Sequence, residues 1–233
     1  MSDEMDYDKS STMYSPEGRI IQVEYSSEAV KKGAPAVGIK TSKGVVLAGV
    51  AKTHSKLLES HEKVLKIDDH IGATSAGYMS DSRLLLDRAR IIAQSYRVTY
   101  DEKIDVSTLA QRLGRLMQRF TQLGGTRPFG CALLFGGISR GGPEIVLIDT
   151  SGALTKSKAA AVGANEPKAL EILKAGYKED MSISEMLKLA VDTLREVSED
   201  LQPEDIDLGI IDAETQTFRL ASEEEIKKVW KKK

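Results

Sequence analysis

The sequence predicts an α+β fold in which two antiparallel β-sheets lie face to face and helices cover both outer surfaces. Two observations support this. Short apolar runs are joined in pairs by tight turns, as in β-hairpins. Longer stretches with a helical period come in consecutive pairs instead of following every strand, which favours antiparallel over parallel sheets. No repeat or low-complexity linker divides the 233 residues, so we expect one domain over residues 1–233.

The first expected element is a short amphipathic helix over residues 18–32. The stretch Tyr14–Gly18 before it has the composition of a turn, because Pro16 restricts φ to about −65° and Gly18 tolerates positive φ. Two lysines and Gly33 follow the last apolar residue of the helix, which is typical of a helix C-terminus. A polar tail, residues 1–12, precedes the turn.

The remaining elements follow from apolar period, turn residues and caps. Expected are strands at 36–39, 45–48, 64–67 and 70–74, helices around 85–96 and 109–123, strands at 131–135, 144–148, 153–155 and 159–162, helices from 165 and 182, strands at 208–211 and 218–220, and a last helix from 222. Ser182 with Glu185 and Ser222 with Glu225 have the spacing of a capping box, and Asn165 is the expected cap of its helix.

Composition excludes several classes of protein. The chain is 41% hydrophobic and 29% charged, as expected for a globular protein. Its net charge of −2 gives no electrostatic reason to expect nucleic acid or an anionic membrane as a partner. No apolar run reaches the roughly 20 residues that span a bilayer, and the acidic N-terminus lacks the apolar core of a signal peptide. With the single Cys131, these features indicate a cytoplasmic protein without an internal disulfide.

The residues alone identify no catalytic group, metal site or cofactor site. The glycines at 136–142 lack the spacing of a nucleotide-binding loop, and no serine stands in a Gly-x-Ser-x-Gly elbow. His54, His61 and His70 lie in scattered polar segments, so we expect surface or turn positions and not metal ligands. Cys131 begins an apolar strand, which favours a buried packing role.

Three segments resemble those of proteasome core-particle subunits: the hairpin GIKTSKGVVLAGVAK, the stretch EKVLKIDDHIGATSAGYMSDSRLLLDRAR and the loop TQLGGTRPFG. The lead YDKSSTMYSPEGRIIQVEYSSEAVKKG resembles the α-type signature in particular. The resemblance covers nearly the whole chain and is closest to archaeal α subunits. It implies the four-layer αββα sandwich of N-terminal-nucleophile hydrolases over residues 34–233, with an extra N-terminal helix in front.

The resemblance also implies that this subunit is not the peptidase. In that family an N-terminal threonine attacks the substrate, assisted by an acid and a lysine. Aligned on the first hairpin, the nucleophile position is Ala34, the acid position is Val50, and only the lysine remains, as Lys63. Ala34 has no hydroxyl, and its amine is bound in a peptide bond. We therefore expect a non-catalytic subunit of a threonine-type endopeptidase complex.

A gate is the role that the resemblance implies for the N-terminal tail. In a homo-heptameric α ring, residues 1–12 would converge on the axial pore and block entry. The cluster that would hold the open form corresponds to Tyr7, Asp8, Pro16 and Tyr25. Lys9 stands where the family usually has arginine, which keeps the charge but loses the bidentate fork. On the residues alone, Met1–Asp6 is better explained as a frayed terminus.

A docking pocket is the second implied site. Lys63 would pair with the C-terminal carboxylate of a hexameric regulatory ATPase, in a groove between neighbouring α subunits. Gly77 and Tyr78 would line that groove, and Glu24 would make a second contact with the activator. Taken alone, Lys63 is better explained as a solvated lysine flanking a strand. Tyr78 replaces the smaller aliphatic residue that is common in the family.

The loop after the second long helix is the third implied site. Leu123, Gly124, Gly125 and Thr126 end that helix and would form a narrow annulus below the gate, through which unfolded polypeptides pass. Many archaeal members have tyrosine where Leu123 stands.

The leading hypothesis is a non-catalytic α-ring subunit that gates substrate entry, scaffolds the catalytic β subunits and docks an ATPase. Two alternatives remain open: a stand-alone α ring that acts as a chaperone-like or binding platform, and an active N-terminal-nucleophile hydrolase whose nucleophile is unrecognised. Peptide hydrolysis by the purified chain, and its native mass with and without β subunits, separate the three.

Overall fold

The helices and strands occur in the predicted order. The computed structural model describes residues 10, 12–52, 57 and 62–231. Its elements are α2 (Ile21–Lys31), β1 (Ala36–Thr41), β2 (Gly44–Val50), β3 (Val64–Asp68), β4 (Ile71–Gly77), α3 (Met79–Tyr100), α4 (Val106–Gln122), β5 (Cys131–Ser139), β6 (Gly142–Ile148), β7 (Leu154–Lys156), β8 (Ala159–Val162), α5 (Glu166–Gly176), α6 (Ile183–Val197), a 3₁₀ turn η1 (Pro203–Asp205), β9 (Ile206–Asp212), β10 (Phe218–Leu220) and α7 (Glu223–Lys231). The predicted α+β class is confirmed.

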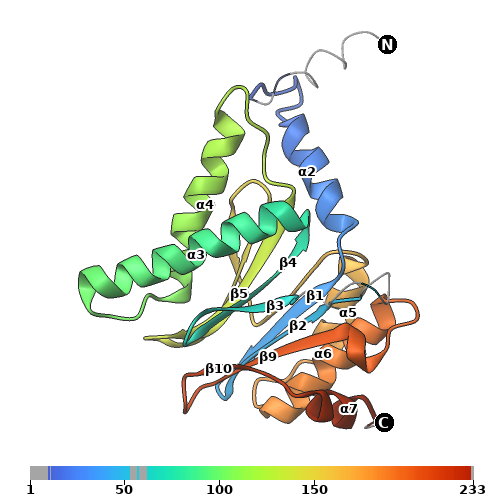
Figure 1. Ribbon diagram of the computed structural model, residues 1–233. Coiled ribbons are helices and arrows are strands. Elements are labelled where there is room, and N and C mark those ends of the chain that lie inside the picture. Colours follow the sequence, from blue (N-terminus) through green and yellow to red (C-terminus); the bar gives the residue numbers. More distant parts are fainter. Residues whose placement is uncertain (1–9, 11, 53–56, 58–61, 232–233) are drawn as a thin grey trace.

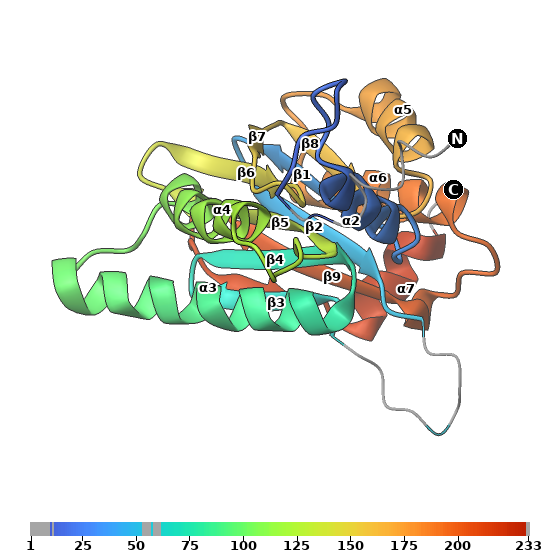
Figure 2. The same ribbon diagram turned by 90° about the horizontal axis from the view of Figure 1, so that it is seen from above.

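The strands form two five-stranded antiparallel sheets that stack face to face (Figures 1 and 2). The first has the strand order β10-β9-β2-β1-β8 and the second β3-β4-β5-β6-β7. All four predicted hairpins are present, and every strand pair is antiparallel. The first sheet is completed by long-range pairing, because β9 lies against β2 and β8 lies against β1.

Helices cover the outer surface of each sheet, which gives the four predicted layers (Figure 1). Helices α3 and α4 pack their apolar faces on the second sheet, and α5, α6 and α7 pack on the first. Strand β2 shows how this works: Val46 and Ala48 face the α6 layer, whereas Val45 and Leu47 point between the sheets. Burying each such leucine or valine stabilises the fold by about 1.5–3 kcal/mol.

Caps were predicted from the sequence for three helices, and two of these caps are present. Ser182 and Glu185 form the predicted capping box of α6, and Ser222 exchanges hydrogen bonds with Glu225 at the start of α7. The prediction that Asn165 caps α5 is wrong. Asn165 occupies the N-cap position with a φ of +57°, and its side chain instead donates to the carbonyl of Val197 at the end of α6, 2.8 Å away.

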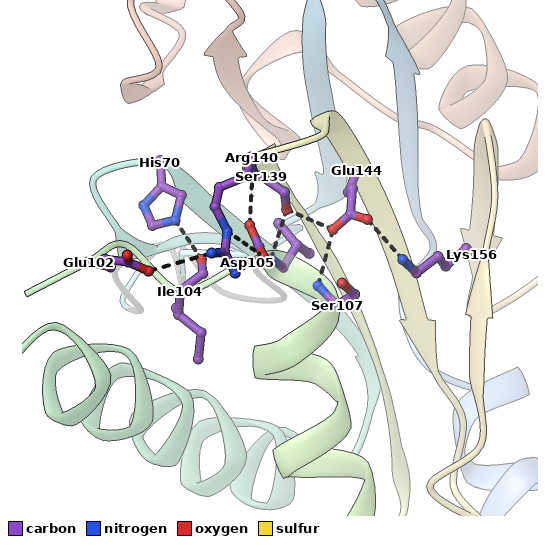
Figure 3. A network of polar contacts seen from close by, with 10 residues as sticks. His70, Glu102, Ile104, Asp105, Ser107, Ser139, Arg140, Glu144 and Lys156 are labelled. Atoms are coloured by element: carbon purple, nitrogen blue, oxygen red, sulfur yellow. Dashed lines mark hydrogen bonds and ion pairs between the residues drawn. The ribbon is translucent and has the colours of Figure 1, made fainter. Parts of the chain in front are cut away.

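The start of α4 is capped by a distant hairpin and not by its own N-cap residue (Figure 3). The N–H of Val106 donates to the hydroxyl of Ser139 (3.0 Å), and the N–H of Ser107 donates to the carboxylate of Glu144 (3.2 Å). Glu144 also accepts from Ser139 and from Lys156. Two of the free donors at the helix start are thus satisfied by the β5–β6 hairpin.

Asp105, the N-cap residue itself, is used for a different contact. It accepts from the backbone N–H of Arg140 (2.9 Å) and from the Arg140 guanidinium, which also reaches Glu102 (Figure 3). Residues of the β5–β6 hairpin thus bind the backbone at the start of α4, and the α3–α4 loop in turn binds Arg140 of the hairpin turn.

Candidate functional site

The N-terminal turn has the conformation that its residues predict. The N–H of Gly18 donates to the carbonyl of Ser15 (2.8 Å) across Pro16, and Gly18 has a φ of +78°. The N–H of Ser15 donates in turn to the carbonyl of Arg19 (2.8 Å). Of the four predicted gate residues, Pro16 lies in this turn and Tyr25 lies on α2, more than half exposed. Tyr7 and Asp8, with Lys9, lie outside the described residues.

Helix α2 lies across one end of the β-sandwich, beside β4 and β5 (Figure 1). It begins at Ile21 and so is shorter at its start than the expected 18–32. Its buried Val30 packs with Ala76, Ala132 and Val162, which come from both sheets. A hydrogen bond between the hydroxyls of Ser27 and Thr150 (2.9 Å) fixes the middle of the helix. The segment before β1 is therefore part of the folded domain.

Ala34 lies exposed in the short link between α2 and β1, so its amine is held within a continuous chain. Gly33 just before it passes so close to β4 that a Cβ there would lie 2.3 Å from the backbone nitrogen of Gly77. Val50, at the predicted acid position, is buried and donates its N–H to the carbonyl of Pro35 (3.0 Å). Ala34, Val50 and Lys63, which the resemblance relates to a catalytic centre, thus lie at one end of the sandwich.

Lys63 is half-buried, contrary to the solvated lysine that the residues alone suggest. Its aliphatic chain lies over β2, where a Cβ on Gly49 would meet Lys63 Cγ at 2.5 Å. Its backbone N–H donates to the carboxylate of Asp207 (2.5 Å), and its carbonyl accepts from Thr74 (2.9 Å). Burial lowers the pKa of the Lys63 amine to about 8, against an opposing effect of Asp207.

Gly77 and Tyr78 form the junction between β4 and α3, beside the start of β5. Gly77 has a φ of +110°, and the N–H of Tyr78 donates to the carbonyl of Gly130 (2.8 Å). The Tyr78 ring lies over Gly130, where a Cβ would come within 2.4 Å of it, and is 57% exposed. A large aromatic is accommodated here because the residue beneath it has no side chain.

Asp81 connects this junction to the loop that follows α4. Its carboxylate accepts two hydrogen bonds from the Arg127 guanidinium (2.6 and 2.9 Å) and one from the N–H of Gly130 (2.8 Å). The hydrogen bonds from Arg127, with the smaller effect of the Gly130 N–H, hold the pKa of Asp81 below its ordinary value in spite of burial. Arg127 also lies over the Tyr78 ring, 5.9 Å from its centre.

Glu24, the expected second contact for an activator, already has a partner within the chain. The Arg19 guanidinium pairs with both carboxylate oxygens, and this hydrogen bonding lowers the pKa of Glu24. Both side chains are exposed, so water screens the pair.

The predicted annulus residues form an open turn at the C-terminal end of α4. Leu123 is 46% exposed, and Gly125 has a φ of +80°. The hydroxyl of Thr126 donates to the carbonyls of Phe120 and Leu123 (3.1 and 2.8 Å), which closes the last turn of the helix. Figure 1 shows this loop at the same end of the molecule as the start of α2.

His70 and Cys131 have packing roles. His70 lies in the β3–β4 turn but is buried, and its Nε2 is 2.8 Å from the carbonyl of Ile104 (Figure 3). Burial lowers the pKa of His70 and raises the pKa of the Cys131 thiol to about 12, so neither group is charged at neutral pH. His54 and His61 lie outside the described residues. No three His, Cys, Asp or Glu side chains in the described part of the chain gather as metal ligands.

Sequence reasoning missed Asp207 and Asp81. Asp207 is a carboxylate near the start of an apolar strand, and its partner Lys63 is 144 residues away in the chain. Asp81 follows the start of α3 and had no visible partner either. An acidic residue at the edge of an apolar segment was the only local signal in both cases.

Comparison with known proteins agrees with this geometry. Residues 30–211 match the family model that describes proteasome subunits, and residues 7–29 match the model for the N-terminal signature of the A-type proteasome subunits. The proteasome alpha subunit of Methanococcus maripaludis is 47% identical over 97% of this chain and 88% of the relative. Those of Methanocaldococcus jannaschii and Methanopyrus kandleri are 43% and 44% identical over 97% of this chain, covering 87% and 92% of each relative.

The chain therefore belongs to the proteasome subunit family. Its N-terminal signature and its relatives define it as an α subunit of the 20S core, a class whose members are non-catalytic and assemble with α and β subunits. In the described residues, no helix has both the length and the apolar character to cross a membrane.

Proposed function

We propose that this chain forms the heptameric α ring of a proteasome core particle, where it gates entry of unfolded polypeptides, scaffolds the β rings and docks a hexameric ATPase. The observation that carries the proposal is the position of α2, which closes one end of the sandwich and keeps residue 34 inside the chain. Ala34 has neither a free amine nor a hydroxyl, so the subunit serves the particle by controlling access and not by cleaving bonds.

The gate is the part of this proposal that concerns residues 1–12. They precede the turn that is closed by the hydrogen bond from the Gly18 N–H to the Ser15 carbonyl, at the same end of the molecule as the loop 123–126 (Figure 1). A tail anchored there reaches the mouth of a ring whose pore is lined by that loop.

Removal of Met1–Thr12 tests the gate. The turn and α2 remain intact in the shortened chain, so the assembled particle forms, and we expect faster hydrolysis of a fluorogenic peptide that must enter through the pore. Hydrolysis of the same peptide by β subunits alone provides the control. An unchanged rate in the assembled particle means that the tail is not the barrier.

The docking pocket is the second part of the proposal, and Lys63 is its centre. A half-buried cation with an alkyl chain packed over Gly49 has a fixed position, and a carboxylate that reaches it forms a charge-assisted hydrogen bond. Gly77 and the exposed Tyr78 remain the proposed lining, and Glu24 the proposed second contact.

Lys63→Ala is expected to abolish ATPase-stimulated degradation of an unfolded protein while the particle still assembles, because the charge that meets the ATPase terminus is gone. Lys66→Ala is the matched control, since Lys66 lies on β3, the strand that begins just after Lys63, is exposed and pairs with Asp69. Unchanged stimulation in Lys63→Ala places the pocket elsewhere.

Scaffolding is supported by an apolar stripe on α3. Leu84, Ile91 and Val98 follow one another at seven-residue intervals and are 57%, 54% and 87% exposed. Residues seven apart share one face of a helix, so these three apolar side chains lie along one exposed face of α3, with polar residues such as Arg88 and Gln94 between them. We propose that this stripe is covered by a β subunit in the core particle.

A further inference from the structure

One row of residues crosses three strands of the first sheet beneath Lys63. Ala36 on β1 is opposite Gly49 on β2, and Gly49 is opposite Asp207 on β9. Residues opposite one another in antiparallel strands share a face, and this face points between the sheets, towards Thr74. Gly49, in the middle of this row, has no side chain, and Asp207 at one end has a carboxylate. The alkyl chain of Lys63 occupies the space that a side chain on Gly49 would fill.

Asp207 holds the backbone at the start of β3. One carboxylate oxygen accepts from the N–H of Lys63 (2.5 Å) and more weakly from that of Val64 (3.4 Å). Without Asp207, the N–H of Lys63 would lose this acceptor just before β3. The position of the Lys63 side chain therefore depends on this carboxylate.

Among the described residues, Asp207 is the charged group that acts on the Lys63 amine. The neighbouring positions on β1, β2 and β4 are Ala36, Gly49 and Thr74, which are uncharged. Asp207 on β9 favours the ammonium form, and the exposed Glu62 lies close enough to raise the pKa of Asp207. Burial works against both charges, raising the pKa of Asp207 and lowering that of Lys63.

We propose that Asp207 is a positioning residue of the carboxylate-docking pocket, which clamps the backbone at Lys63 and keeps the Lys63 side chain in its ammonium form. This inference rests on the docking role proposed for Lys63. The titration of the Lys63 amine makes docking dependent on pH. The pKa of Lys63 is about 8, so the ammonium predominates below that pH, and the pocket loses its charge as the pH rises through it. Without the negative charge of Asp207, Lys63 loses its proton at lower pH.

The test measures binding directly in the assembled core particle. A short fluorescein-labelled peptide copying the C-terminus of the partner ATPase is titrated by anisotropy from about pH 6.5 to about pH 9.5, with the C-terminal amide of the same peptide as a blank. The variants are Asp207→Asn, Lys63→Met and Glu204→Gln. Asp207→Asn keeps an oxygen that accepts the two backbone hydrogen bonds and removes the charge. Glu204 is exposed on η1 and provides the same charge change away from Lys63.

We expect wild-type and Glu204→Gln particles to lose the peptide with a midpoint near pH 8, and Asp207→Asn to lose it roughly one pH unit lower. Lys63→Met binds weakly at every pH. If Lys63→Met binds like the wild type, the docking proposal itself is wrong. If Lys63→Met fails to bind but Asp207→Asn keeps the wild-type midpoint, docking stands and the effect of the Asp207 charge on Lys63 is overturned.

A measurement on the unaltered protein covers the case in which Asp207→Asn does not assemble. The rate at which acetic anhydride labels each lysine, followed by mass spectrometry across the same pH range, reports the fraction of free amine. Lys63 is expected to reach half of its maximal rate near pH 8, well below exposed Lys31, whose pKa is raised by its hydrogen bond with Glu28. A Lys63 midpoint equal to that of Lys31 overturns the pH dependence.

Discussion

Asp81 illustrates how much one side chain can connect. Its carboxylate lies at the start of α3, yet its hydrogen bonds go to Arg127 and Gly130, which follow the loop after α4. The same guanidinium lies over Tyr78. The proposed pocket and the proposed annulus are therefore held in one arrangement by a single carboxylate.

Asp81→Ala is expected to lower the free energy of unfolding by about 2 kcal/mol, because two donors of Arg127 and the N–H of Gly130 lose their largely buried acceptor. The folded-state pKa of Asp81 lies below the ordinary value, so its contribution is complete at neutral pH and disappears as the pH falls below about 4. Urea unfolding at a fixed protein concentration, at pH 7 and again near pH 3, measures both effects.

Asp87→Ala controls for the loss of any carboxylate from α3. Asp87 is exposed and pairs with Arg90 one turn away, so its removal should cost at most about 0.5 kcal/mol. Equal effects of the two substitutions, or an Asp81 effect that persists at low pH, contradict the assignment.

The sequence predicted candidate residues better than it predicted their partners. The turn at Pro16 and Gly18 depends on local φ preferences, and the structure confirms it. The Asp207 clamp on Lys63 depends on β9 pairing with β2, which brings together residues 144 positions apart. Glu24 was expected to face an activator, and its pairing with Arg19 depends on the angle at which the turn enters α2, which local propensity does not determine.

At the scale of elements, the hydrogen bonds from the start of α4 to the β5–β6 hairpin could not be predicted from the local sequence. The helix has good apolar spacing, so its existence was predictable, whereas the acceptors that cap it come from Ser139 and Glu144 in the next hairpin. Burial tends to raise the pKa of Glu144, but hydrogen bonds from Ser139, Lys156 and the Ser107 backbone outweigh burial and lower the pKa.

Glu144→Ala is expected to destabilise the fold by about 1–2 kcal/mol, because the Ser107 N–H loses its acceptor and the Ser139 hydroxyl loses its partner. Amide hydrogen exchange at Val106 and Ser107 should accelerate more than exchange at the other end of α4. Glu102→Ala, which removes an exposed carboxylate paired with Arg140, serves as the control. Uniform acceleration along α4 would mean that Glu144 does not act as a cap.

Strand assignment to sheets was also beyond local pattern. Only Ser157 and Lys158 separate β7 from β8, yet β7 pairs with β6 in one sheet and β8 pairs with β1 in the other. The sequence predicted short strands at 153–155 and 159–162 but not the sheet to which each belongs. Burial distinguishes the two strands. β8 is apolar throughout and mostly buried, whereas all three residues of β7 are exposed.

At the scale of the whole molecule, the fold leaves the α3 stripe exposed on the surface of the chain. An isolated subunit keeps Leu84, Ile91 and Val98 in water, and a core particle that covers them gains roughly 25 cal/mol for each Å² of apolar surface removed from solvent.

Ile91→Asp should therefore prevent assembly with β subunits while the isolated chain keeps its fold, because the charge lies at the centre of the stripe, on the exposed face of the helix. Native mass measurement of the chain mixed with β subunits, together with thermal unfolding of the chain alone, separates the two outcomes.

Leu170→Asp makes the same chemical change on α5, in the opposite helix layer, where Leu170 is 39% exposed. Normal assembly of Leu170→Asp beside failure of Ile91→Asp supports the proposed contact. Full-sized particles formed by Ile91→Asp show that β subunits bind another face.

The close approach of Gly33 to Gly77 has a mechanical consequence. At this point the end of α2 touches the entry to α3 through backbone alone, with no side chain between them to absorb a displacement. We therefore expect a tilt of α2 to displace the backbone beside Tyr78. The contact between the two glycines links the helix that follows the N-terminal turn to the residues proposed to receive an activator.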